Sequence, residues 1–158
     1  MPNVTIEYVI LIPLLFTQVI VFPYVASTMA SNWQNSQIDI ELQTAANHLV
    51  STIQQLYMTL NSEAILAGTV THESPLPLTI GLYPYTAIGS LNDPPDNFAK
   101  VLTVTLTLDE LGNTATASTV LGDNVNWIPS TLRSNSVDGY IVIQKDADIL
   151  TFSFGDVD

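Results

Sequence analysis

The stretch that decides the fold is YVILIPLLFTQVIVFPYVA, Tyr8–Ala26, near the N-terminus of a chain of 158 residues. It belongs to an uncharged run from Tyr8 to Ile38, and a single carboxylate, Glu7, precedes it. About 20 apolar residues with a rise of 1.5 Å each can cross the hydrocarbon core of a bilayer. No Lys or Arg flanks the run, so we expect neither a signal peptide nor an ordinary positive-inside anchor. We therefore expect a different apolar environment for this helix, such as many copies of itself.

The composition of the chain excludes several classes of partner. Three basic residues stand against fifteen acidic ones, which gives a formal net charge of −12. Nucleic acids and anionic membrane surfaces both require clustered Lys and Arg, so we expect neither as a partner. Charged residues make up 11% of the chain, well below the share of about 25% in ordinary soluble domains. The chain has no Cys, which excludes disulfides and thiolate chemistry and favours a protein stabilised by assembly.

The first zone of the chain, Val4–Val25, is apolar around the whole circumference of a helix, as in a helix that is buried on every side. Pro13 and Pro23 fall inside it, and each is predicted to kink the helix because it lacks a backbone donor. Thr17 and Gln18 lie between the prolines. They could form hydrogen bonds across helices in an apolar core, or they could simply weaken the hydrophobicity of the segment.

The second zone, Ser27–Leu66, has one apolar stripe and one polar face. Residues of the stripe recur every three or four positions: Leu42, Ala45, Ala46, Leu49, Ile53, Leu56, Leu60 and Ala64. No Pro or Gly interrupts Val25–Ala67, and Gly68 is a natural stop. The two zones are thus predicted to form a nearly continuous helix of about 63 residues, whose N-terminal half projects.

The third zone, Thr69–Asp158, has the alternation of β-strands. Clear strand patterns occur at Val101–Leu108, Thr114–Leu121, Tyr140–Gln144 and Ile149–Phe154, and shorter ones at Leu76–Tyr83 and Val125–Ile128. A turn at Asp109–Asn113 is predicted to join the first two strands into a hairpin. The simplest arrangement is a small antiparallel sheet that wraps around the apolar stripe.

These patterns predict an α+β fold in which a long N-terminal helix, apolar in its projecting half and amphipathic in its C-terminal half, packs on a small antiparallel β head. The predicted organisation is an apolar N-terminal helix at residues 1–28 and a head at residues 29–158. The head comprises an amphipathic helix at residues 29–67 and a β domain at residues 69–158.

The chain offers little enzymatic chemistry. His48 and His72 are the only imidazoles, and neither has a second ligand at helical spacing, so we interpret both as solvated surface residues. Asp146 and Asp148 form a D-x-D pair that could hold Ca²⁺ but fits a solvated hairpin turn better. The sequence has no nucleophile elbow and no Gly-rich phosphate loop. We expect no catalytic residues, no cofactor and no metal.

Two residues near the N-terminus leave alternatives open. Asn3 begins the only glycosylation sequon, Asn3-Val4-Thr5, which is a potential glycosylation site or a chance match. Glu7 is costly to bury without a partner, so we expect it to pair with the α-amino group of an adjacent copy, or else to remain exposed and interact with the positive end of the helix dipole. Met1 was either created by cutting a longer precursor or simply retained.

Glu7 followed by the apolar run Tyr8–Leu15 resembles the mature N-terminus of type IV pilins and their archaeal relatives. Pro23 is similar to the helix-kinking proline in that zone of many pilins, and the Cys-free, hydroxyl-rich head favours the archaeal branch. The resemblance implies that the apolar helix is the assembly element of a filament. Its residues would include Glu7, Tyr8, Ile10, Leu11, Leu14, Leu15, Phe16, Val19 and Phe22.

The resemblance also implies partners and a location. The precursor would insert transiently in the membrane, a prepilin peptidase would cut it, and an assembly machinery driven by an ATPase would extrude a homopolymer as an extracellular filament. Such filaments act in surface adhesion. The alternatives are a minor pilin or pseudopilin, and a single-pass membrane-anchored protein with an external β domain. Archaeal flagellins are less similar, because their helices are Gly-rich at the start and lack this glutamate and these prolines.

Overall fold

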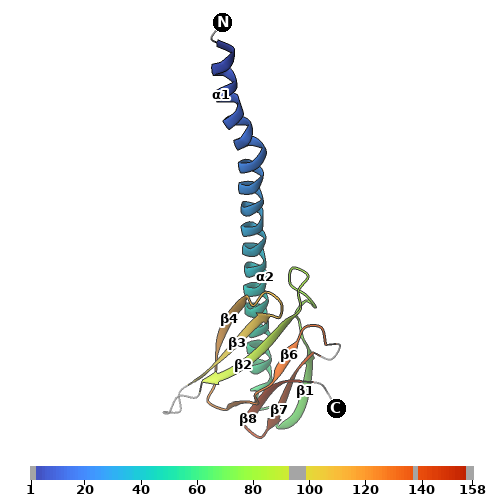
Figure 1. Ribbon diagram of the computed structural model, residues 1–158. Helices are drawn as coiled ribbons and strands as arrows, with labels where there is room; N and C mark the ends of the chain where they lie inside the picture. Colours follow the sequence, from blue (N-terminus) through green and yellow to red (C-terminus); the bar gives the residue numbers. More distant parts are fainter. Residues whose placement is uncertain (1–2, 93–98, 137–138, 156–158) are drawn as a thin grey trace. The chain divides into compact units, whose positions relative to one another are not determined.

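The computed structural model describes residues 3–92, 99–136 and 139–155, with side chains placed at Val9 and from Leu11 onward in the first helix. The chain begins with helix α1, Asn3–Phe16, continues through a π-helical segment η1, Thr17–Val21, and enters helix α2, Phe22–Leu60 (Figure 1). It divides into two compact units, residues 1–37 and residues 38–158. The division falls inside α2.

The π-helical segment lies between the two prolines of the apolar stretch. Pro23 has no N–H to donate to the carbonyl of Val19, and its ring would clash with that carbonyl in a regular α-helix. In η1 the N–H of Phe22 instead donates to the carbonyl of Thr17, five residues earlier. The wider turn gives the backbone another way to pair its donors next to a proline. The kinks expected at Pro13 and Pro23 stay predictions.

In the described residues of the second unit, eight strands form two four-stranded sheets. Their bounds are β1 Ala67–Glu73, β2 Tyr85–Asn92, β3 Lys100–Leu108, β4 Thr114–Leu121, β5 Val125–Trp127, β6 Thr131–Arg133, β7 Tyr140–Asp146 and β8 Ile149–Gly155. One sheet has the order β1-β7-β8-β5, and the other has the order β4-β3-β2-β6. All pairs are antiparallel except β5 with β8, which is parallel.

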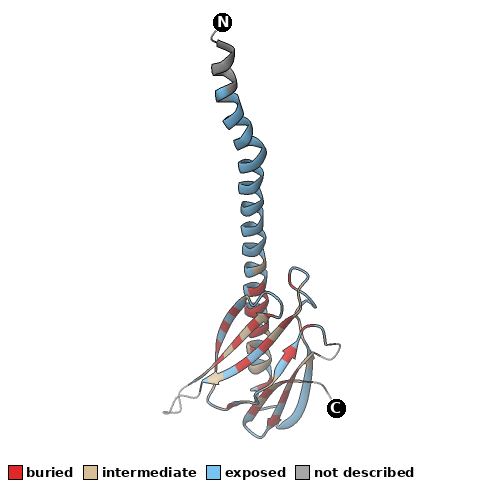
Figure 2. Ribbon diagram, in the orientation of Figure 1, coloured by how far each residue is buried: buried red, intermediate tan, exposed pale blue. Residues whose placement is uncertain are grey.

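The core of this unit lies between the stripe of α2 and the inner faces of the strands (Figure 2). On the helix it uses buried residues that recur every three or four positions: Leu42, Ala45, Ala46, Leu49, Val50, Ile53 and Leu60. Strand β3 alternates strictly, with its leucines and Val104 buried and its threonines partly exposed on the other face. The period of 3.6 on the helix and the period of 2 on the strands thus meet in one hydrophobic core.

The structure confirms the α+β class, with a long N-terminal helix packed on a mostly antiparallel β domain. It also confirms the hairpin β3–β4, whose register pairs Lys100–Thr107 with Thr114–Leu121, and the hairpin β7–β8. The strands form two sheets, however, and not the single small sheet that was expected. Strands β1, β2 and β6 were not predicted. Their sequences are rich in Gly, Ala and Thr, or are only three residues long, and so lack a strong alternation signal.

The segment Leu76–Tyr83, predicted as a strand, is not one. It contains only an isolated bridge between Ile80 and Tyr83, around Gly81 and Leu82, whose φ angles are +57° and +82°. Pro75, Pro77 and Pro84 surround this turn and cannot donate to a ladder, which explains why the pattern of apolar residues does not produce a strand.

The end of the helix also differs from the prediction. Helix α2 ends at Leu60 and not at residue 67, and Gly68 lies within β1. The buried ammonium of Lys145 donates to the carbonyls of Leu60 and Ser62, each at 2.8 Å. A cation at this position donates hydrogen bonds to carbonyls at the end of the helix and interacts favourably with the negative end of the helix dipole. The cap comes from β7, so no residue near the end of the helix could reveal it. The functional division at residue 28 stays a prediction.

Candidate assembly surface

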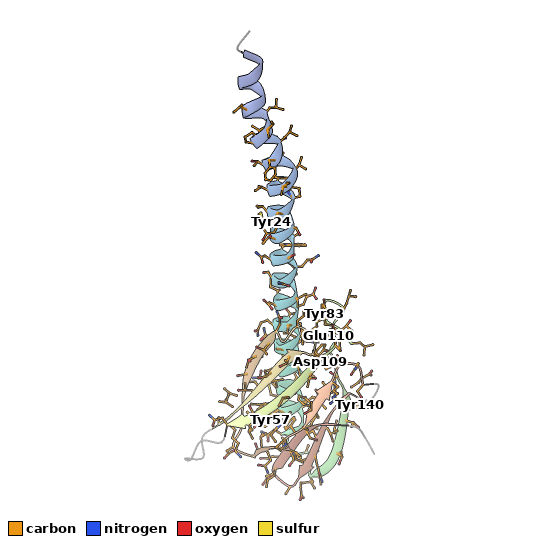
Figure 3. All side chains as sticks on the ribbon, viewed as in Figure 1. Tyr24, Tyr57, Tyr83, Asp109, Glu110 and Tyr140 are labelled. Carbon is orange, nitrogen blue, oxygen red and sulfur yellow. The ribbon has the colours of Figure 1, made fainter. Side chains whose placement is uncertain are left out.

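The first unit exposes almost nothing but uncharged and largely apolar side chains. Every described side chain from Val9 to Gln37 is exposed, and the sequence has no charge between Tyr8 and Ile38 (Figure 2). Side chains point away from the helix axis on all sides, as Figure 3 shows around Tyr24. The large apolar residues in this surface are Val9, Leu11, Ile12, Leu14, Leu15, Phe16, Val19, Ile20, Val21, Phe22, Tyr24, Val25, Met29 and Trp33. We call this set the apolar sleeve.

The sleeve includes six of the nine residues predicted to act in assembly. Leu11, Leu14, Leu15, Phe16, Val19 and Phe22 are all exposed. The side chains of Glu7, Tyr8, Ile10 and Asn3 lie outside the described residues, so their predicted roles stay predictions. Met29 and Trp33 extend the sleeve beyond the predicted segment. They follow Pro23, in a stretch whose other residues are mostly polar. A helical-wheel search for single large apolar residues in this stretch could have found them.

The sleeve is an unusually extensive apolar surface, because each of its fourteen side chains is at least 45% exposed. The largest apolar patch of a typical monomer covers about 300–600 Å², and larger patches mark protein or membrane contacts. Burying one large apolar side chain contributes about 1.5–3 kcal/mol. Even a half-covered sleeve would therefore gain on the order of 10–20 kcal/mol, which outweighs the entropy of ordering the side chains involved. The sleeve is the strongest candidate for a functional surface in the chain.

Three hydroxyl groups of the first unit already donate within the helix. Thr17, Thr28 and Ser31 donate to the carbonyls of Pro13, Tyr24 and Ser27, at 2.9 to 3.0 Å. Such bonds to the preceding turn reduce the cost of desolvating these three hydroxyls when the helix is covered. The amide of Gln18 has no hydrogen bond within the described residues, and it lines a hollow with Thr17 and Phe22. Its predicted bond across helices stays a prediction.

Other chemically interesting residues of the second unit do not gather into a site. No group of three or more His, Asp or Glu side chains suited to a metal occurs among the described residues. His48 lines a groove on α2 with Glu41 and the segment 76–80, whereas Nδ1 of His72 lies 2.7 Å from the carbonyl oxygen of Glu73, on β1. Asp146 ends β7 and Asp148 lies in the turn before β8; both are exposed.

Tyr85 is the one described residue with a strongly shifted acidity. Burial raises the pKa of its phenol well above the ordinary value, and the hydroxyl donates to the carbonyl of Pro77. The backbone N–H of Tyr85 donates to the hydroxyl of Ser134 at 2.9 Å. The first bond fastens the proline-rich segment to the start of β2, which is a structural role for a neutral phenol, and the second joins β2 to the residue that follows β6.

No protein-family model, curated protein or solved structure matches the chain. The helix is long and apolar enough to cross a membrane, by length and composition alone. The functional conclusion therefore depends on the physical properties of the sleeve.

Proposed function

We propose that the protein is a structural subunit of an extracellular type IV pilus-like helical filament. In this proposal the sleeves of many copies pack against one another in an axial core, and the β units form the outside. A prepilin peptidase and an assembly machinery would process the membrane-inserted precursor, and the filament would serve in surface adhesion.

The observation that carries the proposal is that every side chain of the sleeve is exposed. A chain of net charge −12 keeps residues 8–38 free of charge, and the carboxylates whose side chains are described all lie in residues 39–148. Copies that packed through a broad surface of the second unit would have to bring some of these carboxylates close together, which is unfavourable at close range. Copies that pack through the sleeve avoid this repulsion in the core. The resemblance of residues 7–15 to pilin N-termini supports the same arrangement.

A single-pass membrane anchor is the second candidate, because the helix is also long and apolar enough to cross a bilayer. The missing basic flanks and the uncharged polar continuation to Gln37 favour the filament over the anchor. A minor pilin or pseudopilin would use the same sleeve and differ in abundance.

The test is the physical state of the native protein on cells. Shearing should release lipid-free polymers, visible by negative-stain electron microscopy, in which mass spectrometry finds this chain as the main component. An anchored protein would instead remain with membranes until detergent releases it, and that outcome would contradict the proposal. A minor pilin would occur as a trace component of the polymers.

Two matched variants make the test specific. Leu15→Asp introduces one carboxylate into the sleeve, and Leu82→Asp introduces the same carboxylate at a leucine of the second unit that is 91% exposed. We expect Leu15→Asp to reduce polymer yield at least tenfold because a buried, unpaired charge is costly, whereas Leu82→Asp should assemble normally. Equal yields from the two variants would show that the sleeve is not the core.

A further inference from the structure

The second unit has one long strand edge that nothing in the described structure covers. Strand β1 ends the sheet β1-β7-β8-β5 and pairs only with β7, along all seven residues (Figure 1). It has six exposed residues, with only His72 partly buried, and it contains no Pro and a single charge, Glu73, at its end. A long, unpaired and nearly uncharged edge is a template for pairing with another strand.

The other three terminal strands are short or partly covered. Strands β5 and β6 are only three residues long. Strand β4 has eight residues, but the side-chain amide of Gln43 on α2 donates to the backbone carbonyl of Thr116 at 3.1 Å, so the helix covers part of that edge. Short edges and covered edges are standard ways to prevent pairing between sheets. Among the described strands, β1 is therefore the longest edge that has neither of these protections.

The hydrogen-bond pattern shows which groups of β1 face outward. The N–H of Ser74, directly after the strand, donates to the carbonyl of Gly139 on the β7 side at 2.9 Å. Because backbone groups alternate along a strand, the donors and acceptors of Glu73, Thr71 and Thr69 point away from β7. They form a row of groups with no strand beside them in the described part of the chain.

We propose that this edge pairs with the β1 edge of a second copy, antiparallel and centred on Val70. In this register the outward backbone groups of Thr69 pair with those of Thr71 of the second copy, and those of Ala67 pair with those of Glu73. All the outward backbone groups of the strand are then used. It places Glu73, the only carboxylate of β1, opposite Ala67 of the second copy. Pairings of Thr with Thr across strands are favourable, whereas like charges directly opposite each other are not.

Val70 lies on the two-fold axis of this pairing. Its side chain shares the inner side of the sheet with that of Ile143, its partner on β7. It is 37% exposed, although its neighbours on the inner face of β7 are buried. In a pair without hydrogen bonds the Cα atoms approach to about 4.5 Å, so the two valines would cover each other. The pairing joins two four-stranded sheets into one continuous sheet.

The symmetry of the contact determines its role. A two-fold contact closes on itself and cannot propagate a helical polymer. It would therefore link β units of two different filaments, side by side, and would give the filaments a homophilic attachment. This role rests on the proposed function, whereas the pairing itself does not.

Cysteine cross-linking of the full-length protein tests the pairing, because the chain has no native Cys. Val70→Cys places two thiols within disulfide reach across the two-fold axis. The matched control is Val120→Cys on β4, where the valine is more exposed, at 59%. We expect at least tenfold more disulfide-linked dimer from Val70→Cys under mild oxidation. Equal or lower cross-linking than in the control would overturn the proposal.

A second pair of variants tests the register without changing the thiol. Thr69→Asp with Thr71→Asp, added to Val70→Cys, brings like charges opposite each other and should reduce cross-linking at least tenfold. The control is Thr151→Asp with Ser153→Asp, which adds two charges to the outer side of β8 in the middle of the same sheet. Unchanged cross-linking in the β1 variant would contradict the register.

Filament formation is scored on the same samples by negative-stain microscopy. Filaments whose Val70→Cys subunits do not cross-link would overturn the edge pairing and leave the proposed function intact. Cross-linked dimers in samples that never form filaments would support the edge pairing and contradict the proposed function.

Discussion

Helix α2 belongs to two different environments along its length. From Phe22 to Gln37 every residue is exposed, whereas from Leu42 to Leu60 a stripe of residues is buried against the sheets. Both parts are helical, but only the second is stabilised by packing within the chain. An isolated helix gains little in water, so the first part needs contacts from outside the chain. The difference separates residues that hold the fold from residues available for assembly.

Aspartate substitutions on the two sides of this division should give the largest contrast. Ile53→Asp places an unpaired charge in the core of the second unit, where Ile53 is 0% exposed. It should destabilise the unit by about 3–5 kcal/mol or prevent folding. Leu15→Asp should leave the melting of that unit unchanged, as followed by near-UV circular dichroism in detergent. Similar melting curves for both variants would remove the distinction between the two regions.

Lys145→Met should have the next largest effect. It keeps a long side chain but leaves the carbonyls of Leu60 and Ser62 without their buried donor. Loss of a charge-assisted bond at a helix end should cost about 1.5–3 kcal/mol. Urea denaturation measures the loss. Lys145→Arg is the control that retains the charge, and a stability of Lys145→Met equal to that of the wild type would show that the cap is dispensable.

High pH should destabilise the second unit through Tyr85. Because burial raises the pKa of this phenol, the folded chain keeps a proton that the unfolded chain releases above about pH 10. Stability should therefore fall as pH rises above 10, by at most about 1.4 kcal/mol per pH unit. Tyr85→Phe loses the bond to Pro77 at every pH, but its stability should decline less steeply over this range. Parallel declines would indicate that Tyr85 does not contribute.

The smallest effect should come from the bond between α2 and the hairpin β3–β4. The amide of Asn113 donates to Asp39 at 2.6 Å, close to the turn that holds Asp109 and Glu110 (Figure 3). Because this pair is on the surface, Asn113→Ala should cost about 0.5–1.5 kcal/mol, and thermal denaturation measures it. Asn113→Asp should cost more, since it places two carboxylates together. A stability of Asn113→Asp equal to that of the wild type would mean that the contact does not form in solution.

The sequence predicts the parts of the fold that rest on a repeated pattern. The stripe on α2 and the alternation of β3 and β4 each involve several residues of one type at fixed spacing, so they indicate both the element and its buried face. What the sequence could not reveal depends on contacts between distant segments. The cap from Lys145 at Leu60 and the parallel pair β5–β8 join residues with no local signal.

The candidate assembly surface could also be predicted from the sequence only in part. The apolar residues from Leu11 to Val25 identify it directly, because nothing in a soluble monomer could cover them. Its extension to Met29 and Trp33 lies in a polar stretch. The free edge of β1 could not be predicted, because the strand has no clear alternation and its exposure depends on the order of strands in the sheet.

The most direct test of the account is the reactivity of a single thiol at Leu15 in lipid-free, shear-released material. Leu15→Cys is compared with Leu82→Cys, both in the Cys-free chain, using a water-soluble maleimide. The account predicts that the Leu82→Cys thiol reacts fully and that the Leu15→Cys thiol is protected until the polymer is dissociated. Equal reactivity of the two thiols, or protection of Leu15→Cys only when membrane lipid is present, would contradict it.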